Sequence, residues 1–368
     1  MKKILCVVGT RPEAIKMAPV ILALKQANWA ETRVLATAQH RQMLDQVNEF
    51  FGIVPDIDLN IMRPNQTLTE LTARLLPQIQ EVLSNEKPDV VLIQGDTTTV
   101  MTVALACFYQ KIPIGHVEAG LRTWDLNNPF PEEANRVITG KLARWHFAPT
   151  EGSKQNLLKE GVSENEIFVT GNTVIDALLE TAGRELSIGV NIDSKKRLVL
   201  VTSHRRENFG TPFRETCTAL LHLAQRNTDI QILYPVHPNP NVRDTAYEIL
   251  SAQENIILCE PLDYAPFVAA MKAAFLIISD SGGVQEEAPA LGKPVLVLRD
   301  ETERPEAVEQ GVVKLVGPHY EAILREAQML LDDETAYKAM AKGISPYGDG
   351  HAANRIVEIL KNHFFPVI

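Results

Sequence analysis

One stretch of the chain, residues 275–291, combines an apolar run, a glycine turn and a helix-forming segment. The apolar residues 275–278 lead into SDSGG at 279–283, and the helix-forming residues follow directly. Such a turn offers unpaired backbone N–H groups and the positive end of a helix dipole. Glycine also lets an anion approach the backbone closely. The stretch therefore predicts a phosphate site at Ser281, Gly282 and Gly283, although an ordinary strand-to-helix turn is the alternative.

A carboxylate lies within reach of this turn. Glu287 comes four residues after Gly283 and so falls on the same face of the predicted helix. Because helix side chains lean toward the N-terminus, its carboxylate could accept hydrogen bonds from ribose hydroxyls while the turn holds phosphates. The alternative is a surface glutamate. The spacing alone does not decide between a nucleotide site and a surface glutamate.

Further polar residues follow other predicted strands. In open parallel sheets, ligands bind beyond the carboxyl ends of the strands. Clustered carboxylates near cations are what proton transfer beside a phosphate leaving group requires. The residues at such positions, or shortly after them, are Arg11, Lys16, Asp96, Glu118, Glu132 and His204.

Each of these residues also has a structural interpretation. Asp96 could be a helix N-cap, Glu118 and Glu132 could pair with Arg122 and Arg136, and the HRREN segment at 204–208 could be a solvated loop. Any one of these is reasonable alone. The placement of the whole set at strand ends favours a functional site.

The elements that must position these residues alternate along the chain. Short β-branched runs alternate with amphipathic helical segments, which indicates βαβ units and parallel, doubly wound sheets. The predicted strands are 3–8, 33–37, 89–94, 113–117, 145–148 and 167–169, then 197–201, 230–234, 256–258, 275–278, 294–298 and 312–315. The sequence therefore predicts two Rossmann-like domains around a cleft. One spans 1–171 together with the C-terminal helix at about 352–368, and the other spans 172–351.

Composition narrows the function classes. The 368 residues carry a net charge of −10, which argues against nucleic acid or an anionic membrane as a partner. No apolar run reaches the length of a membrane span. The four scattered cysteines are typical of reduced thiols, so we expect a cytoplasmic protein. The sequence has no G-x-G-x-x-G after its first strand, no Walker A motif and no H-E-x-x-H, so we expect no nicotinamide, ATP or metal.

Several longer motifs resemble one known family. They are GTRPEAIKMAP, QGDTTT, GHVEAGLRT, PFPEEANR, HRREN, SDSGGVQEEAP and GKPVLVLRDETERPE. Through nearly its whole length the chain resembles the bacterial non-hydrolysing UDP-N-acetylglucosamine 2-epimerases. The resemblance implies a GT-B-like fold, a homodimer, and interconversion of UDP-GlcNAc and UDP-ManNAc without a cofactor. UDP would be eliminated to a 2-acetamidoglucal and added back, which supplies ManNAc units for capsules or other surface polysaccharides.

The resemblance also implies roles for individual residues. Arg11 and Lys16 match first-domain binding residues, and Asp96, Glu118, Glu132 and His204 match residues implicated in catalysis. The UDP-binding set matches Phe267, Ser281, Gly282, Gly283, Glu287 and Arg304. A regulatory second site for UDP-GlcNAc matches Gln39, Gln42, Glu132 and His237.

Two positions depart from the family pattern, and three other functions stay open. Leu262 replaces a glutamine, and Asn65 replaces an arginine of the regulatory site. The alternatives are a GT-B glycosyltransferase that uses a UDP-sugar, a hydrolysing epimerase that releases free ManNAc, and an inactive sugar-nucleotide sensor. A sensor would have no need for three carboxylates, and we see no basic amphipathic segment of the kind that a membrane-docking transferase offers.

Overall fold

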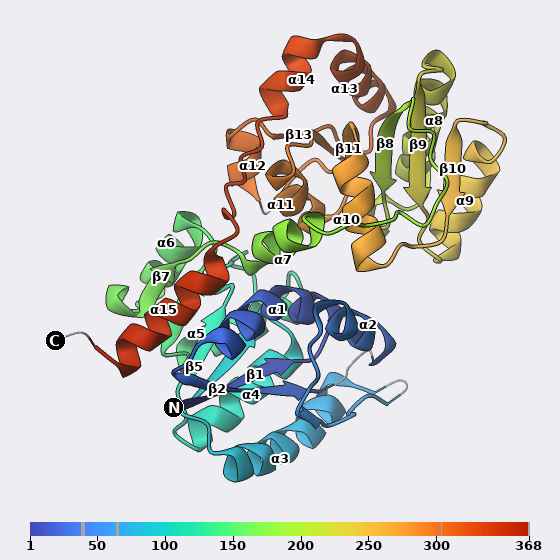
Figure 1. The fold of residues 1–368 in the computed structure, drawn as a ribbon. Coiled ribbons are helices and arrows are strands. Elements are labelled where there is room, and N and C mark those ends of the chain that lie inside the picture. Colours follow the sequence, from blue (N-terminus) through green and yellow to red (C-terminus); the bar gives the residue numbers. More distant parts are fainter. Residues whose placement is uncertain (38–40, 64–65, 303, 367–368) are drawn as a thin grey trace. The chain divides into compact units, whose positions relative to one another are not determined.

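The computed structural model describes residues 1–37, 41–63, 66–302 and 304–366, without the side chains of residues 41–43. The chain forms two compact units (Figure 1). Unit 1 consists of Met1–Ala177 and Tyr347–Ile368, and unit 2 of Leu178–Pro346.

Unit 1 is built on a parallel sheet with the strand order β3-β2-β1-β4-β5-β6-β7. Its strands are β1 (Lys2–Val8), β2 (Ala30–Ala36), β3 (Ile57–Asp58), β4 (Val90–Gln94), β5 (Ile114–Val117), β6 (Trp145–Ala148) and β7 (Ile167–Val169). Its helices are α1 (Arg11–Gln26), α2 (Arg41–Phe51), α3 (Leu68–Glu86), α4 (Thr98–Tyr109), α5 (Glu132–Leu142), α6 (Glu151–Lys159), α7 (Thr173–Ala182), which continues into unit 2, and α15 (Ala352–Phe364).

Unit 2 repeats this plan with the order β10-β9-β8-β11-β12-β13, again all parallel. Its strands are β8 (Arg197–Thr202), β9 (Ile230–Pro235), β10 (Ile256–Cys259), β11 (Leu276–Ser279), β12 (Val295–Val297) and β13 (Val313–Leu315). Its helices are α8 (Thr211–Arg226), α9 (Pro240–Leu250), α10 (Tyr264–Ala273), α11 (Gly282–Ala290), α12 (Pro305–Glu309), α13 (Tyr320–Asp332) and α14 (Glu334–Met340).

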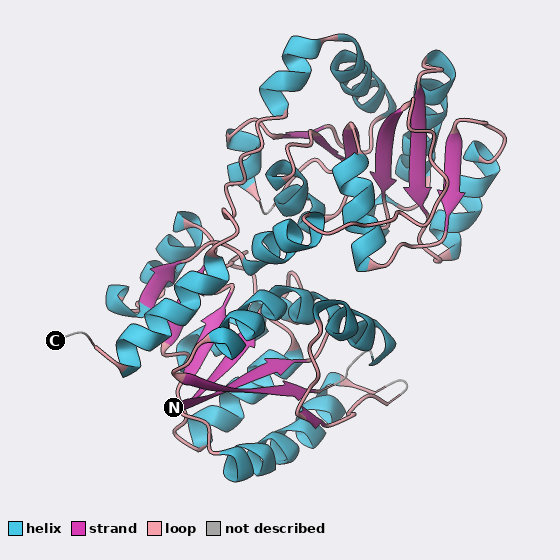
Figure 2. Ribbon diagram, in the orientation of Figure 1, coloured by secondary structure: helices cyan, strands magenta, loops and turns pink. Residues whose placement is uncertain are grey.

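The central strands are apolar because both faces of each sheet are covered. Every residue of β4 and β11 is buried. Figure 2 shows helices alternating with strands throughout each unit, as parallel connections require. The predicted fold class, two doubly wound parallel sheets, is therefore confirmed.

The predicted strands are present to within three residues at either end. Strand β3 is not predicted from the sequence, because two residues are too few to show an alternating pattern. Its place is fixed by pairing with β2, where Leu35 lies opposite Ile57. Helix α1 begins at Arg11, because Thr10 caps it.

The chain crosses between the units inside α7 and again after Pro346. These crossings differ from the predicted boundaries at 171 and 351. Asp176 on α7 accepts hydrogen bonds from the N–H groups of Ala352 and Ala353 at the start of α15. Asn172 N also donates to Tyr347 O at 2.6 Å. These bonds join the first half of α7 and the turn before α15 to unit 1.

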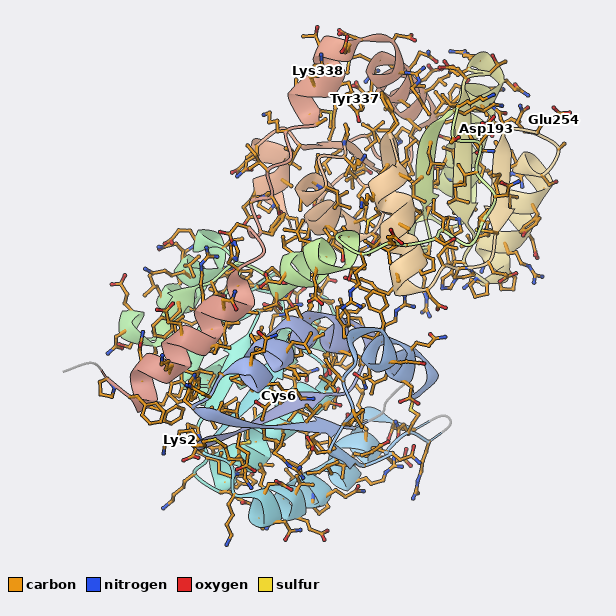
Figure 3. The ribbon with its side chains drawn as sticks, in the orientation of Figure 1. Lys2, Cys6, Asp193, Glu254, Tyr337 and Lys338 are labelled. Carbon is orange, nitrogen blue, oxygen red and sulfur yellow. The ribbon has the colours of Figure 1, made fainter. Side chains whose placement is uncertain are left out.

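The cysteine thiols are mostly interior. Cys6 on β1 (Figure 3), Cys107 and Cys217 are buried, and Cys259 is half-buried. None of these four residues forms a disulfide. Burial raises the pKa of Cys6 to about 12, so this thiol packs as a neutral apolar group. Separately, none of the helices in the described ranges is long and apolar enough to cross a membrane.

Candidate active site

Both sheets reverse their strand order at one point. The reversal lies between β1 and β4 in unit 1, and between β8 and β11 in unit 2. In doubly wound sheets the crevice beyond the carboxyl ends at this point is where ligands bind. The loops that leave these four strands carry many of the predicted site residues.

In unit 1 a buried glutamate joins the two loops. Glu13 Oε2 accepts hydrogen bonds from the N–H groups of Gly9 at 2.6 Å and Thr10 at 3.2 Å, and Thr97 Oγ1 donates to Oε1 at 2.7 Å. Thr10 and Glu13 also form a capping box at the start of α1. Burial raises the pKa of Glu13 to about 7, against hydrogen bonds that favour the charged form.

The next group is centred on Glu118, at the end of β5. Lys16 Nζ on α1 lies 2.6 Å from Glu118 Oε1, and Asn172 Nδ2 donates to the same oxygen at 3.0 Å. Gln94 Nε2 donates to Glu118 Oε2. Glu118 has a φ of +64°, a left-handed conformation that costs a residue with a side chain roughly 1–2 kcal/mol. The backbone thus holds a buried carboxylate in an unfavourable conformation, as is common at functional sites.

Asp96 lies beside this group, after β4. Arg136 on α5 pairs with the Asp96 carboxylate at 2.7 Å, and Asn135 Nδ2 donates to the Asp96 carbonyl at 2.9 Å. Burial raises the pKa of Asp96, Arg136 lowers it, and the nearby carboxylates of Glu118 and Glu132 raise it again. These three carboxylates therefore lie close enough to interact.

The structural interpretations offered for these residues are wrong for Asp96 and Glu118. The N-cap of α4 is Thr97, not Asp96. Arg122 pairs with Glu160 at 2.7 Å rather than with Glu118. Arg136 contacts the carboxylates of Asp96 and Glu133, and no contact between Arg136 and Glu132 is seen within the described residues. Glu132 is the first residue of α5, and Arg11 is the first residue of α1.

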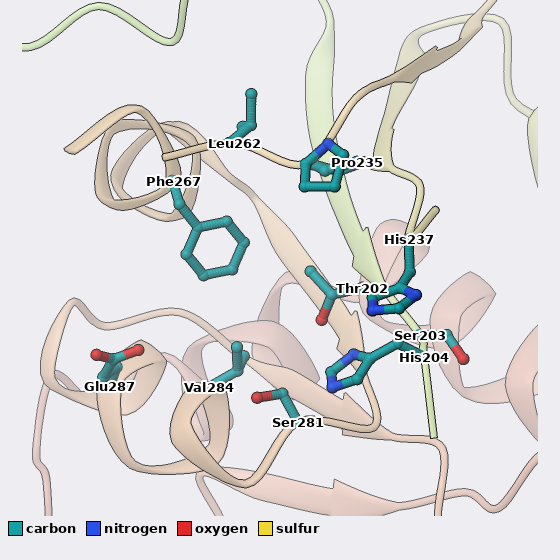
Figure 4. Close-up of a pocket in the computed structure, with 11 residues that line it drawn as sticks. Thr202, Ser203, His204, Pro235, His237, Leu262, Phe267, Ser281, Val284 and Glu287 are labelled. Carbon is teal, nitrogen blue, oxygen red and sulfur yellow. The ribbon is translucent and has the colours of Figure 1, made fainter. Parts of the chain in front are cut away.

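Unit 2 carries an open pocket with a volume of about 220 Å³ (Figure 4). It lies beyond β8, β9 and β11 and extends over the start of α11. The lining residues are Thr202, Ser203, His204, Pro235, His237, Pro261, Leu262, Phe267, Ser281, Val284 and Glu287.

The glycine turn forms one wall of this pocket. A Cβ added at Gly283 would lie 4.0 Å from Glu287 Oε2 and 3.9 Å from Ser281 Oγ. Glu287 therefore leans back toward the N-terminus of α11, as the spacing predicts. A Cβ at Gly282 would lie 2.8 Å from a guanidinium nitrogen of Arg304, so only glycine fits there. Arg304 is in turn held by the buried carboxylate of Glu286 at 2.5 Å.

The loop after β8 is fastened to the same turn through Asp280. Its Oδ2 accepts hydrogen bonds from His204 N at 2.8 Å and Arg205 N at 2.9 Å. The rings of His204 and His237 stack, with their centroids 5.8 Å apart. Burial lowers the pKa of His237, and the neighbouring His204 lowers it further.

The structure thus gathers the predicted residues into two groups, one per unit. Arg11, Lys16, Asp96, Glu118 and Glu132 belong to unit 1, and His204, His237, Phe267, Ser281, Gly282, Gly283, Glu287 and Arg304 to unit 2. Gln39 and Asn65 lie outside the described residues, as does the side chain of Gln42. In the part of the chain that the structure describes, no cluster of three His, Cys, Asp or Glu side chains could hold a metal ion.

Sequence reasoning missed most of the residues that hold these groups in place. They are Glu13, Asn172, Asp280 and Glu286, and Arg136 was predicted only as a partner of Glu132. One signal was readable, because Thr-x-x-Glu before an apolar run is a capping box and predicts Glu13. The partners of the other residues come from distant segments, and no local spacing indicates them.

The parallel sheet of unit 1 has seven strands and that of unit 2 has six, and both reverse their order in the same way with polar groups at the reversal point. This arrangement defines a two-unit α/β protein of the GT-B-like class. A family model described as UDP-N-acetylglucosamine 2-epimerase matches residues 22–361. The chain belongs to the UDP-N-acetylglucosamine 2-epimerase family, whose members are enzymes.

Individual relatives agree along the whole chain. The UDP-N-acetylglucosamine 2-epimerase of Escherichia coli K12 is 56% identical, over 98% of this chain and 99% of that protein. The structure of the Neisseria meningitidis UDP-GlcNAc 2-epimerase bound to UDP-GlcNAc has a TM-score of 0.89 at 49% identity, over 97% of this chain and 99% of that one. The S. aureus MnaA–UDP structure has a TM-score of 0.88 at 46% identity, over 100% and 98%.

Proposed function

We propose that this protein interconverts UDP-GlcNAc and UDP-ManNAc by eliminating UDP and adding it back. One observation carries the proposal. Three interacting carboxylates, Asp96, Glu118 and Glu132, lie together in unit 1 of a chain whose relatives are UDP-GlcNAc 2-epimerases. Proton removal and return need such groups.

The chemistry of the substrate explains why elimination is needed. The C2–H bond of the sugar is barely acidic, and no ketone is formed beside it, so direct deprotonation is unfavourable. If a carboxylate takes the C2 proton while the C1–O bond breaks, the electron pair of the C1–O bond leaves with UDP. The product is a 2-acetamidoglucal. Protonation of C2 on the opposite face, with return of UDP to C1, gives the epimer.

The carboxylates of unit 1 would carry the proton. Because burial raises the pKa of Asp96, this group is a better base than an ordinary aspartate and more readily returns a proton near neutral pH. Glu118 is paired with Lys16, so the positive charge of the lysine lies beside this carboxylate. Glu132, at the start of α5, is the third candidate, and Arg11 would add a cation for the diphosphate.

The pocket of unit 2 would hold UDP while its bond to the sugar is broken. The N–H groups at Gly282 and Gly283 and the guanidinium of Arg304 would bind the diphosphate, which gains negative charge as it leaves. The N–H group of Ser281 already donates to Ser279 Oγ at 2.9 Å. Glu287 would accept the ribose hydroxyls. Phe267 and the backbone at Leu262 border the same pocket and would contact the uracil.

Further properties follow from the family resemblance. We propose a homodimer in the cytoplasm that supplies ManNAc units for a surface polysaccharide. We also propose activation by a second UDP-GlcNAc at Glu132 and His237, weakened by the asparagine at position 65. Initial rates from pure UDP-ManNAc test this activation. Rates that do not rise when UDP-GlcNAc is added below inhibitory levels would contradict it.

Product analysis tests the main proposal against its alternatives. Purified protein is incubated with UDP-GlcNAc and no added cofactor, and the products are identified by NMR. We expect UDP-GlcNAc and UDP-ManNAc in equilibrium. Free ManNAc as the main product would indicate a hydrolysing epimerase, and turnover that needs a sugar acceptor would indicate a glycosyltransferase.

A further inference from the structure

We propose that Asp280 is a positioning residue for His204, which fixes one proton on Nδ1 of the imidazole and leaves Nε2 for the ligand. This inference deepens the proposed function and rests on it, because His204 lines the pocket that would hold UDP. Asp280 directly follows β11, and His204 lies in the loop after the neighbouring strand β8.

Asp280 is a fully buried carboxylate, with an exposed fraction of 0%. Its Oδ2 accepts three hydrogen bonds, from Ser203 Oγ at 3.0 Å, His204 N at 2.8 Å and Arg205 N at 2.9 Å. Its backbone carbonyl accepts a fourth, from Arg205 Nε at 3.0 Å. One oxygen of the carboxylate is therefore committed to holding the loop.

The other oxygen faces the imidazole. Asp280 Oδ1 lies 3.4 Å from His204 Nδ1, and in the described part of the chain it has no hydrogen-bond partner. A buried carboxylate oxygen is costly to leave without a donor. A proton on Nδ1 would supply that donor after a small approach of the ring. The acceptor thus selects the tautomer, as the acid does in a Ser-His-Asp triad.

The other side of the ring belongs to the pocket. Figure 4 shows His204 beside Ser281 and close to His237, at the end of the pocket opposite Phe267. His204 is itself among the pocket's lining residues, so Nε2 is the nitrogen available to a bound ligand. When the ring is doubly protonated, Asp280 stabilises the imidazolium, and Nε2–H can donate a charge-assisted hydrogen bond to the diphosphate.

The tautomer can be measured directly. Protein labelled with ¹⁵N-histidine is studied by long-range ¹H–¹⁵N NMR with and without UDP, and His204 is assigned with His204→Gln. We expect the Nδ1–H tautomer in the wild type. In Asp280→Asn the amide oxygen must stay with the three donors, so the NH₂ group faces Nδ1 and the proton should move to Nε2.

A matched control separates this role from general stability. Glu326 on helix α13 is also a buried carboxylate of unit 2. It is paired with Lys314, on the edge strand β13, at 2.5 Å. Glu326→Gln should leave the spectrum of His204 unchanged even if it destabilises the fold. A wild-type ring with its proton mainly on Nε2 would overturn the proposal. A single tautomer shared by Asp280→Asn and the wild type would also overturn it.

Kinetics give a second measurement. We expect Asp280→Asn to lower kcat about 10²- to 10⁴-fold while UDP affinity, measured by calorimetry, stays near that of the wild type. An unchanged kcat would overturn the proposal.

The two proposals can fail separately. If the wild type does not epimerise UDP-GlcNAc, the proposed function fails, but the wild-type tautomer still decides the role of Asp280. If Asp280→Asn does not fold, the wild-type spectrum alone gives the decision.

Discussion

The two sheets of this protein reverse their strand order in the same way, and each reversal point is closed by a buried carboxylate. In unit 1, Glu13 binds its own turn and reaches Thr97 in the loop after β4. In unit 2, Asp280 comes from the loop after β11 and reaches back to the loop after β8. The carboxylate that links the two loops therefore follows the first strand, β1, in unit 1, and the fourth strand along the chain, β11, in unit 2.

This difference determines which groups remain for a ligand. In unit 1 the helix N-terminus is occupied by the capping box, and the charged groups beside it are Asp96, Glu118 and Lys16. In unit 2 no side chain among the described residues caps the start of α11, and Ser281 at this helix start lines the pocket. On the proposed function, one topology would therefore serve proton transfer in unit 1 and anion binding in unit 2.

The largest expected effect comes from the carboxylates of unit 1. Asp96→Asn, Glu118→Gln and Glu132→Gln should each lower kcat about 10²- to 10⁴-fold, because each removes one acid–base group. UDP should still bind, since unit 2 is unchanged. Turnover measured by NMR and UDP affinity measured by calorimetry check both statements.

Glu164→Gln is the control for the carboxylate variants, because Glu164 is exposed and pairs only with Lys154 among the described residues. It should keep full activity. A carboxylate variant that loses UDP affinity and keeps its kcat would contradict the division of roles between the units.

A smaller effect is expected in the pocket of unit 2. Glu287→Ala should weaken UDP binding roughly ten- to a hundredfold, because hydrogen bonds to a charged group contribute about 1.5–3 kcal/mol. UMP should lose as much affinity as UDP, since both carry the ribose. Equal UDP affinities for the variant and the wild type would refute the ribose contact.

The last prediction concerns stability and compares two capping boxes of unit 1. The pKa of buried Glu13 is raised to about 7, so the folded protein keeps a proton that the unfolded chain releases near 4.5. The free energy of unfolding should therefore fall by about 2–3 kcal/mol as the pH rises from 5 to 8, because this contribution is lost. Urea unfolding should therefore show Glu13→Gln gaining stability relative to the wild type over this range.

The second box, Thr67 with Glu70 on α3, is the control. Glu70 is exposed, and its hydrogen bonds to Thr67 lower its pKa, so it is ionised at both pH values. The difference between Glu70→Gln and the wild type should not change from pH 5 to pH 8. Parallel stability profiles for Glu13→Gln and the wild type would contradict the buried, protonated state of Glu13.

The sequence predicted the frame of this molecule well and its supporting contacts poorly. Strands such as β4 and β11 are short, apolar and buried on both faces, so their pattern can be read locally. The lean of Glu287 over the glycine turn also follows from helix geometry alone. The pairing of Asp96 with Arg136 spans 40 positions, and the bonds from Ser203 and His204 to Asp280 span 77 and 76. Such contacts depend on how the strands are ordered in the sheet.

The most direct test of the central claim is the fate of the C2 hydrogen in heavy water. If UDP leaves as a carboxylate removes the C2 proton, the glucal must take a new proton from a group in exchange with solvent. We predict that UDP-GlcNAc and UDP-ManNAc recovered at equilibrium carry deuterium at C2, as detected by NMR and mass spectrometry. Epimerisation that leaves the original hydrogen at C2 in both sugars would contradict the elimination and re-addition of UDP.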